Sequence, residues 1–146
     1  MSDNQAEHTG SCYCSAVEVT VTGVPGAAGY CHCFSCRKWH SAPINAFCVF
    51  PKDSVQIEGD VTISQVDAGS ERVSCKVCGG CVANRKPANN MIAVYAMTLA
   101  ETDFKFEPAF HIFYEERVMD VTDGLPKYID RPKGFGGSGD TMGESG

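Results

Sequence analysis

Hydrophobic and polar residues alternate strictly between positions 17 and 22. Valine occupies positions 17, 19 and 21, and Glu18, Thr20 and Thr22 stand between the valines. Because the side chains of a β-strand point alternately to its two faces, this pattern predicts a strand with one buried face. The segment that follows, Gly23-Val24-Pro25-Gly26, predicts the turn that ends it.

Other short apolar runs indicate further strands. They cover residues 46–50, 72–75, 91–97 and 110–114, and the pairs of apolar residues at 55/57 and 61/63 predict a hairpin around Gly59-Asp60. A short helix is expected over residues 34–39. Many short strands separated by turns predict an all-β fold built from small antiparallel sheets.

The chain has 146 residues, which is the size of one domain. Residues 1–9 are polar and predict a flexible N-terminus, and residues 10–130 predict the folded domain. Residues 131–146 are rich in glycine and serine with little to bury, which predicts a disordered tail.

Charge and hydropathy exclude several classes of partner. The formal net charge is −6 and the basic residues are scattered, so a nucleic-acid partner is not expected. No apolar run approaches the ~18 residues of a membrane-spanning helix. The polar segment from Met1 to Thr9 lacks the apolar core of an export signal. Nine cysteines in such a chain predict a reducing compartment, and we expect the cytoplasm.

Seven of the nine cysteines form three tight clusters. The clusters are Cys12-x-Cys14, Cys31-x-Cys33-x-x-Cys36 and Cys75-x-x-Cys78. Cysteines one or two residues apart cannot readily meet disulfide geometry with each other, but they can present both sulfurs to one tetrahedral ion. The clusters therefore predict two zinc ions that hold the sheets together.

One division of these ligands gives a closed site and an open site. Four of them, Cys12, Cys14, Cys75 and Cys78, would form a structural site. The remaining Cys31, Cys33 and Cys36 would leave a fourth position free, as catalytic zinc sites do. Spacing alone does not establish this division. Cys81 or Cys48 could complete the second site, although Cys48 lies in a predicted strand and is better interpreted as a small buried hydrophobe.

Several other side chains are candidates for roles near the open site. His40 could line it, and His40 or Ser41 could deliver a proton. Arg37 could bind a substrate carboxylate, or it could simply be a surface cation. His32 stands between two ligands, so its side chain should point away from the metal, to a supporting or solvent-facing position. His111 follows an apolar residue and is expected to be a core histidine.

The combined pattern resembles a known family. The matching segments are Gly10-x-Cys12-x-Cys14, Cys31-His32-Cys33-x-x-Cys36-Arg37-Lys38, Cys75-x-x-Cys78-Gly79, Pro108-x-x-His111-Ile112 and Asp123-Gly124-Leu125-Pro126. They resemble the glutathione-dependent formaldehyde-activating enzymes, a family that includes centromere protein V. The resemblance implies a β-tent fold, the same four-cysteine structural zinc and a catalytic zinc on the other three cysteines.

The resemblance also implies an activity. The chain would be a carbon–sulfur lyase that binds a thiol such as glutathione at the open zinc and adds it to, or releases it from, a small carbonyl compound such as formaldehyde. The alternative is a binding module without catalysis, in which Cys81 closes the second zinc site. The sequence leaves the oligomeric state open.

Overall fold

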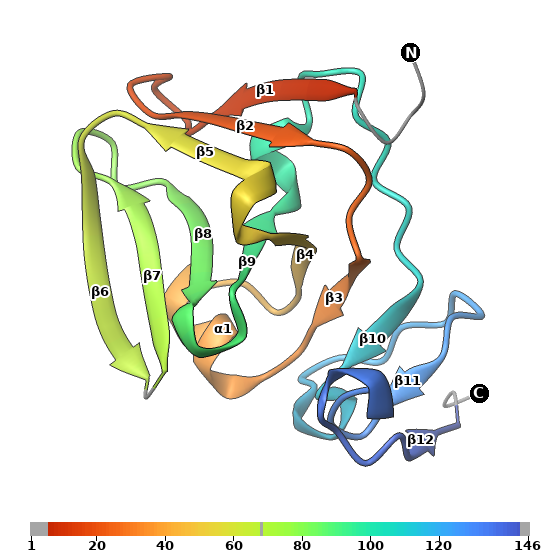
Figure 1. Cartoon of the computed structure of the whole chain (residues 1–146). Helices are drawn as coiled ribbons and strands as arrows, with labels where there is room; N and C mark the ends of the chain where they lie inside the picture. The colour runs from red at the N-terminus through yellow and green to blue at the C-terminus, as the bar shows by residue number, and fades with distance from the viewer. Residues whose placement is uncertain (1–5, 68, 144–146) are drawn as a thin grey trace. The chain divides into compact units, whose positions relative to one another are not determined.

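The computed structural model describes residues 6–67 and 69–143. These residues fall into two compact units (Figure 1). One unit contains the described residues up to Ala27 together with Cys48–Phe106, and the other contains Ala28–Phe47 and the described residues from Glu107 onward. Strands predominate over a single α-helix in the described part of the chain, which confirms the all-β class. None of its helices is long and apolar enough to cross a membrane.

The first unit contains a three-stranded antiparallel sheet. Its strands, in the order β1-β2-β5, are β1 (Glu7–Ser11), β2 (Glu18–Thr22) and β5 (Val55–Glu58). The alternation predicted for β2 is confirmed, because Val19 and Val21 are fully buried. Glu7–Ser11 begins inside the segment expected to be flexible, and residues 1–5 lie outside the described part.

The hairpin predicted around Gly59-Asp60 is wrong. β5 pairs with β2, and β6 (Val61–Asp67) pairs with β7 (Ser70–Cys75). Gly59 has a φ of +123°, and a Cβ at this position would lie 2.3 Å from the carbonyl oxygen of Ala16. The glycine therefore lets the chain pass closely over the residues before β2 as it leaves one sheet for the next. Alternation predicts a strand but does not identify its partner.

The larger sheet of the first unit is an antiparallel meander. It runs from β6 through β7 and β8 (Cys81–Lys86) to β9 (Met91–Tyr95), and the second half of β4 (Asn45–Pro51) follows β9 in the strand order. Short 3₁₀ turns flank these strands: η2 (Lys52–Ser54) leads from β4 to β5, η3 (Pro87–Asn89) connects β8 to β9, and η4 (Ala96–Leu99) follows β9. The core of this unit includes the fully buried Val73, Val82, Val94 and Leu99.

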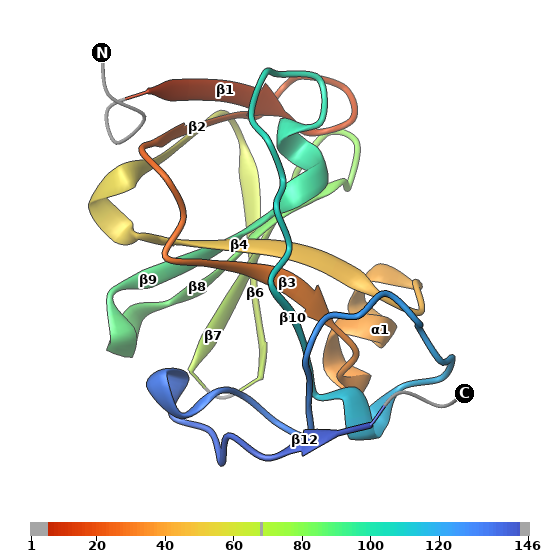
Figure 2. The same ribbon diagram turned by 90° about the vertical axis from the view of Figure 1, so that its right-hand side faces the viewer.

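The second unit contains α1 (Phe34–His40), the helix that the sequence predicts over 34–39. Its strand order is β12-β11-β10-β3, followed by the first half of β4. The strands are β3 (Ala27–Cys31), β10 (Phe110–Ile112), β11 (Lys127–Tyr128) and β12 (Thr141–Met142), with η5 (Tyr114–Glu116) after β10. β10 runs parallel to both β3 and β11, unlike the antiparallel pairing expected. Figure 2 labels β3 and β10, which lie side by side. Long connections on both sides of β10 permit this direction.

The C-terminal segment differs from the disordered tail expected over 131–146. Within the described residues, it forms η6 (Lys133–Phe135) and β12, which pairs with β11; residues 144–146 lie outside them. The carboxylate of Asp130 organises this loop, accepting the amide N–H of Ser138 at 3.0 Å and its hydroxyl at 2.9 Å. The glycines and serines of this segment therefore form ordered turns, because the side chain of Asp130, which lies just before the segment, holds them in place.

Candidate metal centres and their surroundings

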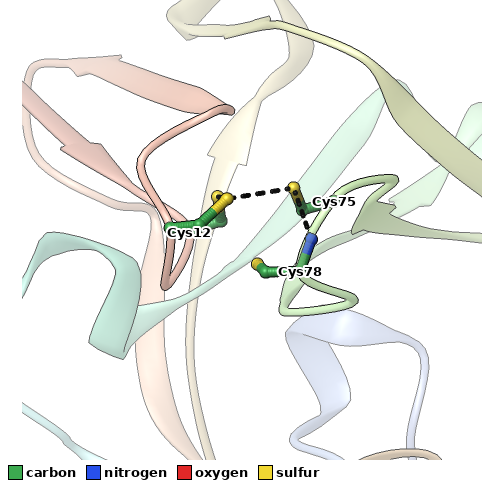
Figure 3. A group of neighbouring side chains, drawn as sticks. Cys12, Cys75 and Cys78 are labelled. Carbon is green, nitrogen blue, oxygen red and sulfur yellow. Dashed lines mark hydrogen bonds between the residues drawn. The ribbon is translucent and has the colours of Figure 1, made fainter.

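Four cysteines of the first unit converge from two turns. Cys12 and Cys14 lie in the loop between β1 and β2, Cys75 ends β7, and Cys78 lies in the turn between β7 and β8 (Figure 3). All four sulfurs lie within 4.8 Å of one another, and Cys14 Sγ is 3.8 Å from both Cys12 Sγ and Cys75 Sγ. Sulfurs placed about 2.3 Å from a tetrahedral zinc ion are about 3.8 Å apart, whereas a disulfide needs about 2.05 Å. The four sulfurs could therefore hold a metal ion.

Backbone amides point at these sulfurs. Cys75 Sγ accepts hydrogen bonds from the amides of Val77 at 3.3 Å and Cys78 at 3.4 Å, and Cys78 Sγ accepts one from Gly80 at 3.3 Å. The amides of Gly80 and Cys14 lower the pKa of the Cys78 thiol to about 6. Such bonds favour thiolate, the form that binds metal.

The second unit brings together the other three clustered cysteines. Cys31 ends β3, Cys33 caps α1 and Cys36 lies in the first turn of that helix, and their sulfurs lie within 4.8 Å of one another. Cys33 Sγ accepts the amide N–H of Cys36 at 3.3 Å. Crowding by Cys33 and Cys36, together with burial, raises the pKa of the Cys31 thiol well above its ordinary value. A divalent cation would remove this penalty, because it neutralises the clustered thiolates.

The other candidate residues lie in α1 or directly after it. Arg37 donates its Nε–H to the carbonyl oxygen of His32 at 3.0 Å, so part of its guanidinium already holds the cysteine loop. Ser41 ends the helix in a left-handed conformation, with a φ of 51°. His40 is the last residue of α1. The proton-delivery roles of His40 and Ser41 and a substrate contact by Arg37 stay predictions.

The two remaining cysteines both belong to the first unit. Cys48 lies in β4 and is fully buried, and burial raises the pKa of its thiol to about 12. These properties suit the interpretation of Cys48 as a small hydrophobe. Cys81 begins β8 and is partly exposed. That either residue completes the three-cysteine cluster stays a prediction.

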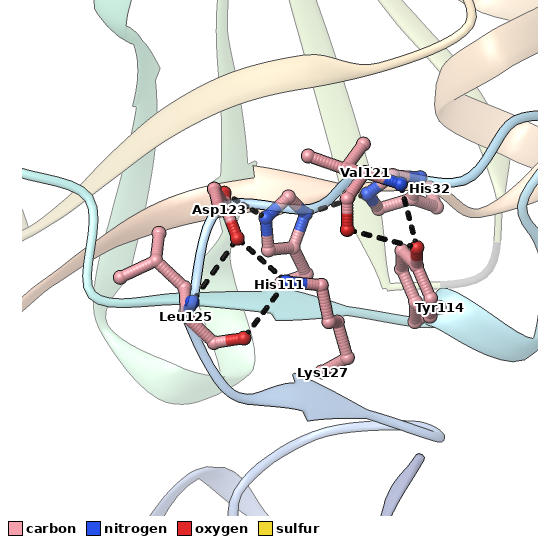
Figure 4. A network of polar contacts seen from close by, with 7 residues as sticks. All are labelled: His32, His111, Tyr114, Val121, Asp123, Leu125 and Lys127. Atoms are coloured by element: carbon pink, nitrogen blue, oxygen red, sulfur yellow. Dashed lines mark hydrogen bonds and ion pairs between the residues drawn. The ribbon is translucent and has the colours of Figure 1, made fainter. Parts of the chain in front are cut away.

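A buried polar row lies next to the three-cysteine loop in the second unit (Figure 4). His32 is fully buried, and its Nε2 is 2.8 Å from Nδ1 of His111, which is also buried. Nε2 of His111 is 2.7 Å from Asp123 Oδ2, and Lys127 Nζ donates to Asp123 Oδ1 at 2.5 Å. The aromatic ring of Tyr114 packs edge-on against both imidazoles. A solvent-facing position for His32 is therefore wrong, whereas the core position expected for His111 agrees with its burial.

Charge and burial set the protonation of this row. Burial, followed by the neighbouring His111 and three nearby cationic side chains, lowers the pKa of His32 to about 4. Burial works against ionisation of Asp123, yet the hydrogen bonds from Lys127 and His111 hold its pKa well below the ordinary range. Asp123 is therefore a carboxylate at neutral pH. The sequence pattern marks Asp123-Gly124-Leu125-Pro126 only as a matching segment. It does not predict the histidine pair, because 79 residues separate the two histidines.

Comparison with known proteins identifies the family of the chain. Residues 7–116 match the sequence model of the family described as glutathione-dependent formaldehyde-activating enzyme. The chain belongs to this family. Its match therefore includes all seven clustered cysteines and the buried His32 and His111.

Two individual proteins are similar to the chain over part of its length. An uncharacterized lyase of Schizosaccharomyces pombe is 34% identical over 73 residues, which is 50% of this chain and 53% of the relative. The match thus spans about half the length of that curated relative. A crystal structure of a Rhodobacter sphaeroides protein is similar with a TM-score of 0.54 and 21% identity, over 64% of this chain and 88% of that one. At this identity the likeness shows the fold alone.

Proposed function

We propose that the protein is a zinc-dependent carbon–sulfur lyase that binds a thiol such as glutathione at the three-cysteine cluster. Membership of the glutathione-dependent formaldehyde-activating family supports this activity, as does the name of the Schizosaccharomyces pombe relative, a lyase. The observation that carries the proposal is the contrast between the two clusters. One group of mutually close sulfurs has four members and the other has three. Three protein ligands leave room for a substrate sulfur as the fourth.

The donor set also favours a thiol over water. When bound, zinc would supply a Lewis-acidic template that holds a thiol as its thiolate. Cys31, Cys33 and Cys36 would donate strongly to the ion, and such a soft site suits a sulfur substrate better than the activation of hard water. Cys12, Cys14, Cys75 and Cys78 would hold a second, structural zinc.

Side chains in and directly after α1, or water, would carry out the remaining steps. The substrate sulfur would form a bond to the carbonyl carbon of formaldehyde, and the carbonyl oxygen would take up a proton, giving S-hydroxymethylglutathione; the reverse steps would release both partners. His40, Ser41 or water would deliver that proton. The part of the Arg37 guanidinium that does not contact His32 would bind a substrate carboxylate. A cytoplasmic location suits this chemistry, because free thiols stay reduced there.

Cobalt-substituted protein tests the proposal directly, because the sulfur-to-cobalt charge-transfer absorption reports how many thiolates bind the ion. We expect a saturable rise in this absorption when glutathione is added, and we expect Cys33→Ser to abolish the rise. Cys48→Ala is the control and should behave as the unaltered protein. Absorption that already corresponds to four thiolates at both sites, that ignores glutathione and that decreases in Cys81→Ser would replace the enzyme with the non-catalytic binding module.

A further inference from the structure

The buried row beside the three-cysteine loop joins four side chains from three segments of the second unit. Lys127 contacts Asp123, Asp123 contacts His111, and His111 contacts His32, at 2.5, 2.7 and 2.8 Å (Figure 4). His32, His111 and Lys127 are each at most 1% exposed. A buried chain of this kind is costly to build unless its members are mutually satisfied.

Counting protons along the row fixes the direction of each hydrogen bond. A carboxylate only accepts, so Nε2 of His111 carries the proton that it shares with Asp123 Oδ2. The charge of Asp123 is already balanced by the buried ammonium of Lys127, and a second buried cation on His111 would lack a counterion. His111 is therefore neutral, its Nδ1 accepts, and Nε2 of His32 must be the donor.

This arrangement fixes His32 at three points. Its ring donates to His111, its backbone amide donates to the carbonyl oxygen of Ile112 at 3.1 Å, and its own carbonyl oxygen accepts from Arg37 at 3.0 Å. Cys31 and Cys33 are its immediate neighbours along the chain. The orientation of the His32 ring and the backbone path between these two cysteines are consequently coupled.

We propose that Asp123 and His111 are positioning residues, which set the tautomer and orientation of His32 and thereby hold the sulfurs of Cys31 and Cys33 in place. Neither residue touches the sulfurs. Asp123 selects the proton position on His111, His111 selects that on His32, and His32 fixes the loop. The inference rests on the proposed function only in taking the three cysteines as ligands of a bound ion.

The tautomers can be observed without any substitution. In protein with ¹⁵N-labelled histidine, long-range proton–nitrogen correlation spectra distinguish protonated from bare ring nitrogens. We expect Nε2 to be protonated and Nδ1 bare in both His32 and His111. A doubly protonated His111, or a His32 protonated on Nδ1, would overturn the proposal. This readout does not depend on activity, so it separates a failure of this inference from a failure of the proposed enzyme.

The coupling to the cysteine loop is tested by metal release in Asp123→Asn. An amide keeps the size of the side chain but removes the charge that fixes the tautomers. A chelator should remove zinc from the protein in two phases, and Cys33→Ser identifies the phase that belongs to the three-cysteine cluster. We expect Asp123→Asn to accelerate that phase roughly tenfold and to leave the four-cysteine phase unchanged.

Asp103→Asn is the matched control, because Asp103 also accepts from a histidine, His8, at 2.7 Å, but the pair lies in the first unit. It should leave both phases unchanged. Equal acceleration of both phases in Asp123→Asn would mean a general loss of stability, and no acceleration would mean no coupling; either outcome contradicts the positioning role. If Asp123→Asn does not fold, the tautomer measurement on the unaltered protein still decides.

Discussion

At the scale of single residues, the structure separates cysteines with different chemistry. Cys78 accepts the amide N–H of Gly80, and its pKa is lowered to about 6. Cys48 is enclosed in β4, and burial raises its pKa to about 12. The same side chain is therefore a thiolate in one environment and an inert thiol in the other at neutral pH.

This contrast predicts selective alkylation of the metal-free protein. We expect Cys78 to react readily at pH 7, with a rate that rises through a midpoint near pH 6, and Cys48 to stay unmodified until the chain unfolds. Peptide mapping by mass spectrometry after brief treatment with iodoacetamide measures both. Equal labelling of the two residues in the folded protein would contradict the prediction.

The lowered pKa also sets a pH dependence of stability. The pKa of Cys78 in the folded protein lies below its ordinary value of 9.0. The stability that the Cys78 thiolate contributes to the folded state is therefore fully present above about pH 9 and is lost as the pH falls through about 6. In metal-free protein the free energy of unfolding should therefore decrease over this window. Denaturant titrations at several pH values measure the decrease, and Cys78→Ser should show less of it.

Gly10 illustrates steric constraint at the same scale. A Cβ at this position would lie 1.9 Å from the carbonyl oxygen of Thr98, so no side chain fits without movement of the backbone. We expect Gly10→Ala to reduce the free energy of unfolding by about 1–3 kcal/mol. Gly134→Ala, whose added Cβ meets nothing within 4 Å, is the control and should change it by less than about 0.5 kcal/mol. Chemical denaturation of both variants measures the difference.

At the scale of elements, sequence patterns identified strands better than their partners. The alternation of β2 and the apolar run of β4 predicted both strands, because the pattern of buried side chains along a strand depends only on the local backbone conformation. The partner of β5 was predicted wrongly, and β10 was not expected to be parallel to β3. Pairing depends on how distant segments pack, and no local pattern records that.

The loop before β12 gives a prediction for an element. Asp130 accepts hydrogen bonds from both the amide and the hydroxyl of Ser138, so Asp130→Ala should loosen residues 131–143. We expect faster amide hydrogen exchange in this segment and an unchanged zinc content. Asp53→Ala, which removes an exposed carboxylate from η2, is the control and should leave the exchange of 131–143 unaltered.

At the scale of the whole molecule, the candidate metal sites were more predictable than the polar row. Cysteine spacing alone indicated metal, because two sulfurs one or two residues apart suit a shared ion. The grouping of Cys12 and Cys14 with Cys75 and Cys78 agrees with the structure, which brings the four sulfurs together. The contact between His32 and His111 could not be predicted, because one histidine in an apolar strand usually means simple burial.

Removal of the metal should affect the whole chain. We expect about two zinc ions per chain, and we expect Cys14→Ser to lose one ion and several kcal/mol of stability, because Cys14 helps to join two turns of the first unit. Cys48→Ala should retain both ions. Elemental analysis combined with thermal unfolding measures both effects, and full zinc retention by Cys14→Ser would contradict the four-cysteine site.

Because the chain is synthesised from its N-terminus, the two cysteine clusters gain all the residues that hold them in place at different times. All four members of one cluster have been synthesised once Cys78 is added, whereas His32 must wait for His111, 79 residues after it. At about 5–20 residues per second, the ribosome adds these 79 residues in roughly 4–16 seconds. During that interval Cys31, Cys33 and Cys36 exist without the support of β10. We therefore expect the nascent chain to bind metal at the four-cysteine cluster first and at the three-cysteine cluster afterwards.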